Sequence, residues 1–130
     1  MDMYSEFRKE PEPMFKDKTI LCGASSYEEI FYFNPDFDSL PEAVKNELRI
    51  MCVLFTADVG GILRLEYDSD GSLNFTVESK SDDFFFDEIG SVLKIKQLQQ
   101  EKKELLESLE TYYRVFFLDG DMEDDHVNRD

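Results

Sequence analysis

The sequence predicts an α+β domain with the element order β-β-α-β-β-α, in which a four-stranded antiparallel sheet carries two helices packed mainly on one face. Two pairs of short apolar segments are joined by turn residues, and each pair is followed by a longer segment with apolar residues at helical spacing. The 130-residue length fits one domain. We assign that domain to residues 19–118, between a flexible polar arm (1–18) and an acidic disordered tail (119–130).

The composition restricts the class of partner. The chain has 14 basic and 30 acidic residues and a net charge of −16 at pH 7. Phosphate backbones and anionic bilayers repel such a charge, so we expect no nucleic-acid partner and no membrane partner. A basic protein partner, a divalent cation or solubility alone remain as reasons for the acidity. No apolar run is long enough to span a bilayer and no secretory signal is visible, so the sequence predicts a cytoplasmic protein.

The first hairpin is predicted from two short apolar segments. Thr19–Cys22 and Glu29–Phe33 are rich in β-branched, apolar and aromatic residues, and Gly23–Ser26 between them has turn composition. Pro35 lacks the amide that a strand ladder needs, so the hairpin is expected to end at Asn34-Pro35.

A helix is predicted from Ser39 to Val59. Ser39 and Glu42 have the spacing of a capping box, and Gly60-Gly61 supplies a stop signal. Its apolar face comprises Val44, Leu48, Met51, Cys52, Phe55 and Val59. Because Ile50–Phe55 is apolar all round, we expect this helix to lie between the sheet and either the last helix or another chain. The alternative interpretation makes Met51–Thr56 a central strand.

The second hairpin has the clearest alternation in the sequence. Ile62–Tyr67 and Leu73–Glu78 alternate apolar and polar residues, and pairing Tyr67 with Leu73 places the apolar residues of both strands on one face. Asp68–Gly71 has turn composition. It also resembles a fragment of a calcium loop, but the twelfth position is Ser79 where such loops have Glu.

One long C-terminal helix is predicted over Ser91–Leu118, capped by Ser91 and stopped by Gly120. At 1.5 Å per residue it would be about 40 Å long, longer than the body beneath it. Its apolar stripe, interrupted at Lys102, is expected to contact a second copy. Early lysines and late glutamates on this helix permit antiparallel pairing in a homodimer. The stripe comprises Ile95, Leu98, Leu105, Leu106, Leu109, Tyr112, Tyr113 and Phe116.

A phenylalanine triplet between acidic pairs is the second candidate interaction element. Phe84, Phe85 and Phe86 cannot all face the same way on a helix or strand, so at least one must find another surface, either the protein's own arm or another protein. Exposed apolar patches commonly mark interfaces. The candidate interaction residues are therefore the triplet and the helix stripe together.

No catalytic constellation is recognisable, and we predict no catalytic residues, no metal site and no cofactor. Cys22 and Cys52 have no CxxC spacing, and the single His126 falls in the predicted tail, so the thiols are expected to be reduced, buried hydrophobes. Val59–Gly61 lacks the spacing of a phosphate-binding loop.

The leading hypothesis is therefore a non-catalytic protein-interaction or regulatory module that acts as a homodimer. One alternative is a domain that binds a small molecule or divalent cation, conceivably an enzyme using carboxylates and Tyr27, Tyr32 or Tyr67. Another is an acidic nucleic-acid mimic that binds a basic protein, which requires carboxylates in rows on one surface.

Several segments resemble a family of small acidic bacterial (Firmicutes-type) proteins of unknown function. The resemblance covers most of Leu21–Leu118 and implies a free-standing cytosolic protein, with no activity or site residues to transfer. The segments that carry it are Phe33–Pro35, Leu40–Glu42, Ile50–Phe55, Asp58–Gly61, Phe86–Gly90, Leu93–Leu98 and Tyr112–Leu118.

Overall fold

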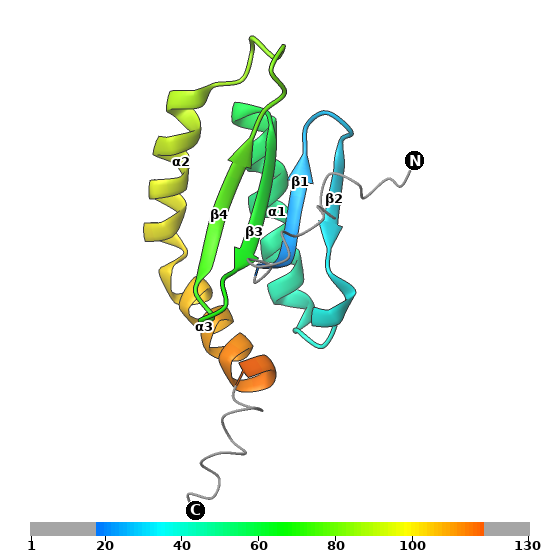
Figure 1. Ribbon diagram of the computed structural model, residues 1–130, viewed down its shortest axis with the longest axis vertical. Helices are drawn as coiled ribbons and strands as arrows, with labels where there is room; N and C mark the ends of the chain where they lie inside the picture. Colours follow the sequence, from blue (N-terminus) through cyan, green and yellow to red (C-terminus); the bar gives the residue numbers. More distant parts are fainter. Residues whose placement is uncertain (1–17, 119–130) are drawn as a thin grey trace, which may run out of the picture.

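The computed structural model describes residues 18–118 and confirms an α+β fold with a four-stranded antiparallel sheet. The predicted tail, including Gly120 and His126, and the predicted arm up to residue 17 lie outside this range. The strands have the spatial order β2-β1-β3-β4 (Figure 1). Their bounds are β1 (Thr19–Ser25), β2 (Ile30–Phe33), β3 (Ile62–Tyr67) and β4 (Leu73–Glu78).

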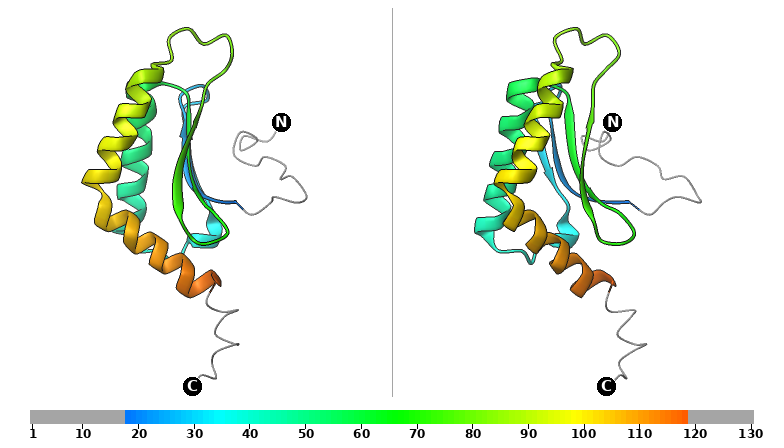
Figure 2. Two further views of the ribbon diagram at one scale, coloured as in Figure 1. Left: turned by 60° about the vertical axis from the view of Figure 1, so that its left-hand side comes forward. Right: turned by 90° about the vertical axis from the view of Figure 1, so that its left-hand side faces the viewer.

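Three α-helices occur among residues 18–118. They are α1 (Glu42–Val59), α2 (Glu88–Glu101) and α3 (Lys103–Tyr113); a short 3-10 helix, η1 (Pro35–Phe37), precedes α1, and a π-helical turn, η2 (Arg114–Leu118), follows α3. Helices α1 and α2 lie side by side over one face of the sheet, and α3 bends toward the end of the sheet where β3 turns into β4 (Figure 2).

The β3–β4 hairpin has the predicted register. Leu63 pairs with Val77, Leu65 with Phe75 and Tyr67 with Leu73, so their side chains share the face toward the helices. The connection is a hairpin turn in which the Asp70 carboxylate accepts a hydrogen bond from the amide of Ser72 at 2.9 Å. Within residues 18–118, no group of three His, Cys, Asp or Glu residues is placed to hold a metal ion.

The bounds predicted for the first hairpin were wrong. Strand β1 continues through Gly23 to Ser25, and the turn lies at residues 26–29. The reason is that β1 is an inner strand, which pairs with β2 on one side and β3 on the other. Ala24 pairs with Leu63 and Ser25 with Ile62, and these ladder hydrogen bonds outweigh the turn preference of the segment.

Helix α1 forms in the predicted segment but begins at Glu42 and not at Ser39, and the alternative of a strand at Met51–Thr56 is wrong. It ends at Val59, and the next residue, Gly60, has a φ of +87°, which glycine adopts more readily than other residues. The predicted capping box does not form, because the residue before the helix is Pro41, in an extended conformation. Ser39 instead places its hydroxyl 2.7 Å from the hydroxyl of Tyr112.

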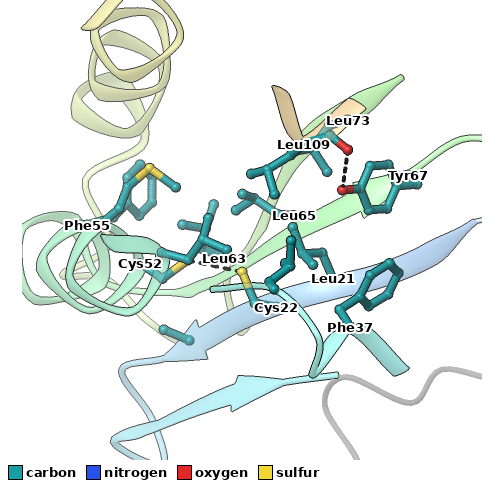
Figure 3. Packing of buried hydrophobic residues seen from close by; sticks show 14 of the residues in the cluster. Leu21, Cys22, Phe37, Cys52, Phe55, Leu63, Leu65, Tyr67, Leu73 and Leu109 are labelled. Atoms are coloured by element: carbon teal, nitrogen blue, oxygen red, sulfur yellow. Dashed lines mark hydrogen bonds between the residues drawn. The ribbon is translucent and has the colours of Figure 1, made fainter. Parts of the chain in front are cut away.

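The core lies between α1 and the sheet (Figure 3). Leu48, Cys52 and Phe55 of α1 are buried against β1 and β3, where Leu21 and Leu65 are fully buried. Aromatic rings fill the end of the core beneath α3. Phe37 stacks on Tyr67 with ring centroids 5.7 Å apart, and the hydroxyl of Tyr67 donates to the carbonyl of Leu109 at 2.9 Å.

The prediction of one long C-terminal helix was wrong, because the helical segment breaks at Lys102, whose φ and ψ are −107° and 23°. Lys102 is where the apolar stripe is interrupted, and its ammonium bonds Glu47 of α1 at 3.0 Å. The start was also predicted wrongly. The Asp87 carboxylate caps α2 by accepting from the amide of Gly90 at 2.8 Å, whereas Ser91 is buried in the first turn.

Candidate functional site

The predicted helix stripe mostly covers the protein's own core. Leu109 and Tyr113 are buried, while Phe116 is largely exposed. The break at Lys102 allows α3 to turn toward the sheet, so the argument that the helix is too long for its own body does not hold. The remaining stripe residues are partly buried against the core: Ile95, Leu98, Leu105, Leu106 and Tyr112.

Exposed apolar side chains lie instead on the outer surfaces of α1 and α2. Ile50 and Leu54 of α1 are 56% and 62% exposed, although they belong to the apolar run expected to be covered on both sides. Ile50–Ala57 contains no charged residue over two helical turns, and this was the sequence signal for an uncovered surface. We define the α1–α2 face as Ile50, Val53 and Leu54 of α1 with Ile89 and Leu93 of α2, all exposed.

A groove of about 660 Å³ runs between the two helices. Met51, Leu54 and Phe55 of α1 and Leu98 of α2 provide apolar lining, and Ala43 and Lys102 belong to its other lining residues. The helices run antiparallel, because Asp58 bonds Lys94 at 2.7 Å while Glu47 bonds Lys102 at 3.0 Å. The groove therefore extends from the middle of both helices to the start of α1 and the end of α2.

The layer formed by these helices is close to electrically neutral. The two helices and the lysines that follow α2 carry six cations and five anions, in a chain with a net charge of −16. The cations are Lys45, Arg49, Lys94, Lys96, Lys102 and Lys103, and the anions are Glu42, Glu47, Asp58, Glu88 and Glu101. A neutral layer can approach an equally acidic molecule without strong repulsion.

The loop from residue 79 to residue 87 presents two phenylalanines. Phe84 and Phe85 are 89% and 96% exposed. Phe86 lies against Gly61, where a Cβ would come within 2.9 Å of its ring. The second surface was expected to be the arm or another protein, and for Phe86 it is instead the glycine pair after α1. The amide of Asp87 also donates to the carbonyl of Val59 at 3.0 Å, which fixes the loop to the end of α1.

Tyr27 holds the other side of this loop. Its hydroxyl donates to the Asp83 carboxylate at 2.6 Å and accepts from the amide of Lys80 at 3.0 Å. Asp83 in turn accepts from the amide of Phe85 at 2.9 Å. The loop is thus tied on both flanks, and the exposure of Phe84 and Phe85 belongs to an ordered arrangement.

Replacing Tyr27 with Phe is expected to raise the pKa of Asp83 toward its ordinary value of 3.8, because the hydroxyl bond holds that pKa down. A lowered folded-state pKa contributes stability above about pH 4, and this contribution is lost as the pH falls through the folded value. Carbon-13 NMR titration of the Asp83 carboxyl in both proteins measures the change. An unaltered pKa in the Tyr27→Phe protein would contradict the assignment.

The groups considered for chemistry do not converge on one site. The sulfurs of Cys22 and Cys52 are 3.9 Å apart and buried, and burial raises the pKa of the Cys22 thiol well above its usual range. Tyr67 is fully buried in the core, which raises its pKa far above the ordinary phenol value. Tyr27 is bonded to Asp83, and Tyr32 lies on β2 opposite Gly23. Asp87 caps α2.

A protein family matches every described residue of the chain, whereas no curated protein and no solved structure matches it. Within residues 18–118, none of the helices is both long enough and apolar enough to traverse a bilayer. The model of a family of unknown function (DUF6145) matches residues 18–121, which is most of the 130 residues. The chain therefore belongs to the DUF6145 family of unknown function.

Proposed function

We propose that this protein is a non-catalytic interaction or regulatory protein of the cytoplasm that acts as a homodimer through the α1–α2 face. The observation that carries the proposal is the uncharged, outward-facing surface of Ile50, Val53 and Leu54 on α1. A helix face without charge that remains exposed in a monomer favours association. The predicted stripe on the last helix contributes through Leu98, which lines the adjoining groove.

The available area supports a dimer. The five exposed side chains of the α1–α2 face offer on the order of 500 Å² of apolar surface per copy, so a symmetric pair would bury roughly 1,000 Å², the lower limit for a specific interface. Neighbouring polar groups at the groove would add to this area. The estimate favours a dimer that dissociates on dilution over one that is permanent.

The distribution of charge favours a second copy as the partner. Two molecules of net charge −16 repel each other, except where the contacting surfaces are neutral. The α1–α2 layer meets this condition because its lysines and arginine balance its carboxylates. A strongly basic partner would gain little from this surface and would be attracted to the acidic remainder of the molecule.

Replacing Leu54 with Glu is expected to convert the dimer to a monomer of 15.3 kDa, because two charges would be buried at the centre of the interface. Size-exclusion chromatography with light scattering, over a concentration series, measures the mass. Val115→Glu is the matched control, since Val115 is an exposed apolar residue beyond α3. A monomeric wild-type protein, or a Leu54→Glu protein that dimerises like the wild type, would overturn the proposal.

The groove volume favours a small-molecule site as the second candidate function. About 660 Å³ lies within the range of ligand-binding pockets, and the lining is apolar with a few polar groups. A monomeric wild-type protein whose groove binds the dye ANS, with binding reduced by Leu54→Glu, would favour this candidate. The nucleic-acid mimic stays a prediction.

A further inference from the structure

We propose that residues 1–17 of this chain lie across the face of the sheet that points away from α1 and α2, so that the sheet is covered on both sides. The proposal is independent of the proposed homodimer, which uses the outer surface of the helices. It replaces the prediction that the arm is flexible. We define the outer sheet face by residues that point away from the helices: Ile20 and Gly23 of β1, Tyr32 of β2, Arg64 and Glu66 of β3, and Thr76 of β4.

The middle of the outer sheet face is buried. Gly23 is buried although it has no side chain, and the side chain of Arg64, its partner in the register, is only 3% exposed. Side chains stand roughly perpendicular to a sheet, so neighbours on the same face lie beside an arginine and not above it. Another segment therefore lies over these two residues. The cross-strand row that it covers is Tyr32, Gly23, Arg64 and Thr76.

The elements within residues 18–118 lie elsewhere. Helices α1 and α2 cover the opposite face of the sheet (Figure 2). The loop from residue 79 to residue 87 is attached at the end of the sheet, where Tyr27 bonds Asp83, and Arg64 lies further along β3. Glu78 accepts a hydrogen bond from Arg64 at 2.7 Å, but it is a neighbour on β4 whose own side chain is 44% exposed. The cover is therefore assigned to a segment outside this range.

The part of the outer sheet face on β1 and β2 also has the composition of a covered surface. Ile20, Gly23 and Tyr32 are its outward residues, and none of them is charged. A sheet face that is left in water usually carries polar residues at alternate positions, as β3 and β4 do with Arg64 and Glu66. Ile20 and Tyr32 are only half-exposed. An apolar segment on this half of the face would protect both side chains from water.

Length and attachment favour the arm as this segment. Lys18 bonds Asp68 at 3.1 Å, so the arm joins β1 at the end of the sheet where β3 turns into β4. Gly23 is four residues after Thr19, which corresponds to about 13 Å along the strand. Seventeen residues can span up to about 55 Å when extended, so an arm that turns back over β1 reaches the buried row easily.

Side-chain chemistry also favours the arm over residues 119–130. The arm has four large apolar side chains that can cover an apolar face: Tyr4, Phe7, Met14 and Phe15. The apolar side chains of residues 119–130 are Met122 and Val127 alone. That segment also follows η2, beyond α3, so it would have to pass around the end of the sheet to reach the outer face.

Paramagnetic broadening of NMR signals tests the position of the arm. Full-chain Thr76→Cys protein carries a nitroxide on the outer sheet face, and the native thiols stay unlabelled because both are buried. The amide signals of residues 1–12 are expected to broaden; residues 13–17 are not scored, because the chain itself keeps them near the sheet. A nitroxide on Arg49→Cys protein, exposed on α1, is the matched control and is expected to leave residues 1–12 sharp.

Two results of this experiment would overturn the proposal. One is a set of signals from residues 1–12 that the nitroxide at position 76 leaves sharp, including the case in which residues 119–130 broaden instead. The other is equal broadening of residues 1–12 when isotope-labelled protein without nitroxide is mixed with unlabelled protein that carries it. The second result would show that the cover comes from another copy of the chain.

Trypsin cleavage after Arg8 and Lys9 tests the attachment by a different property. Replacing the four apolar arm residues (Tyr4→Ser, Phe7→Ser, Met14→Ser and Phe15→Ser) is expected to speed this cleavage at least about tenfold, because the arm loses the side chains that hold it on the sheet. Each rate is divided by that of the free peptide 1–17 of the same sequence, which corrects for the preference of the protease. A protein with Phe84→Ser and Phe85→Ser is the control, since it loses two exposed rings elsewhere and should be cleaved at the wild-type rate. Equal corrected rates for the wild type and the four-residue variant would contradict the proposal.

Discussion

Replacing Phe37 with Ala is expected to lower the free energy of unfolding by about 3–5 kcal/mol, the usual cost of removing a buried phenylalanine ring. Phe37 is fully buried, and it contacts rings from three parts of the chain. Its centroid lies 5.7 Å from that of Tyr67 on β3, 6.2 Å from that of Tyr113 on α3 and 4.9 Å from that of Phe117. The substitution therefore leaves a cavity where the sheet and the C-terminal helices meet.

Urea denaturation followed by circular dichroism measures this loss. The Leu54→Glu background is used for all variants, so that dimer formation does not add to the measured stability. Phe85→Ala is the matched control, since the same ring is removed from a 96% exposed position and the expected change is within about 0.5 kcal/mol. Equal losses for Phe37→Ala and Phe85→Ala would contradict the described burial.

Replacing Leu109 with Ala is expected to cost about 2–5 kcal/mol, because Leu109 is the most deeply buried residue of α3. Two hydrogen bonds beside it join α3 to the hairpin. The Tyr67 hydroxyl donates to the Leu109 carbonyl at 2.9 Å, and the amide of Leu73 donates to the Glu110 carboxylate at 2.7 Å. Loss of the leucine side chain weakens the packing that holds both bonds in place.

Phe116→Ala is the comparison for this variant, because the stripe pattern assigned Leu109 and Phe116 to the same face. Phe116 is largely exposed and contacts the ring of Tyr112, so its removal is expected to cost less than about 1.5 kcal/mol. Hydrogen exchange of α3 amides gives a local readout. Unchanged protection of α3 in the Leu109→Ala protein would contradict the proposed attachment.

The local parts of the fold were predictable because short-range chemistry determines them. The register of β3 and β4 follows from a period of two and a connection of five residues between Tyr67 and Leu73. The end of α1 follows from Gly60, which adopts a φ that other residues avoid. In both cases the residues that decide the structure lie within a few positions of one another.

The errors arose where a distant segment decides the structure. Strand β1 is longer than predicted because β3, about 40 residues later, pairs with it through Ser25. Ser39 has the sequence context of a helix cap, but its hydroxyl is hydrogen-bonded to the hydroxyl of Tyr112 instead. The break at Lys102 depends on the direction that α3 must take to reach the core. The apolar periodicity before and after the lysine does not specify that direction.

The candidate site was predicted only in part, again because distant segments decide which surfaces are covered. Periodicity shows which residues share a helix face, but it does not show which face the rest of the protein covers. The pattern therefore assigned the stripe around Leu109 to a partner, and it left the run around Leu54 to be covered by the last helix or by another chain. In the monomer Leu109 is buried and Leu54 is exposed. The phenylalanine triplet was expected to find a second surface on the arm or on another protein, whereas Phe86 docks on Gly61, and this docking depends on the tertiary structure.

The strand order has a consequence for the folding pathway. Each hairpin closes within one short stretch of chain, on a timescale of about 1–10 μs, whereas β1 and β3 must meet across the whole of α1. Closing that larger loop costs more chain entropy, and the central ladder is therefore expected to form last. Until it forms, both halves expose an unpaired inner strand, so the newly synthesised chain is most prone to misassociation just before the two hairpins join.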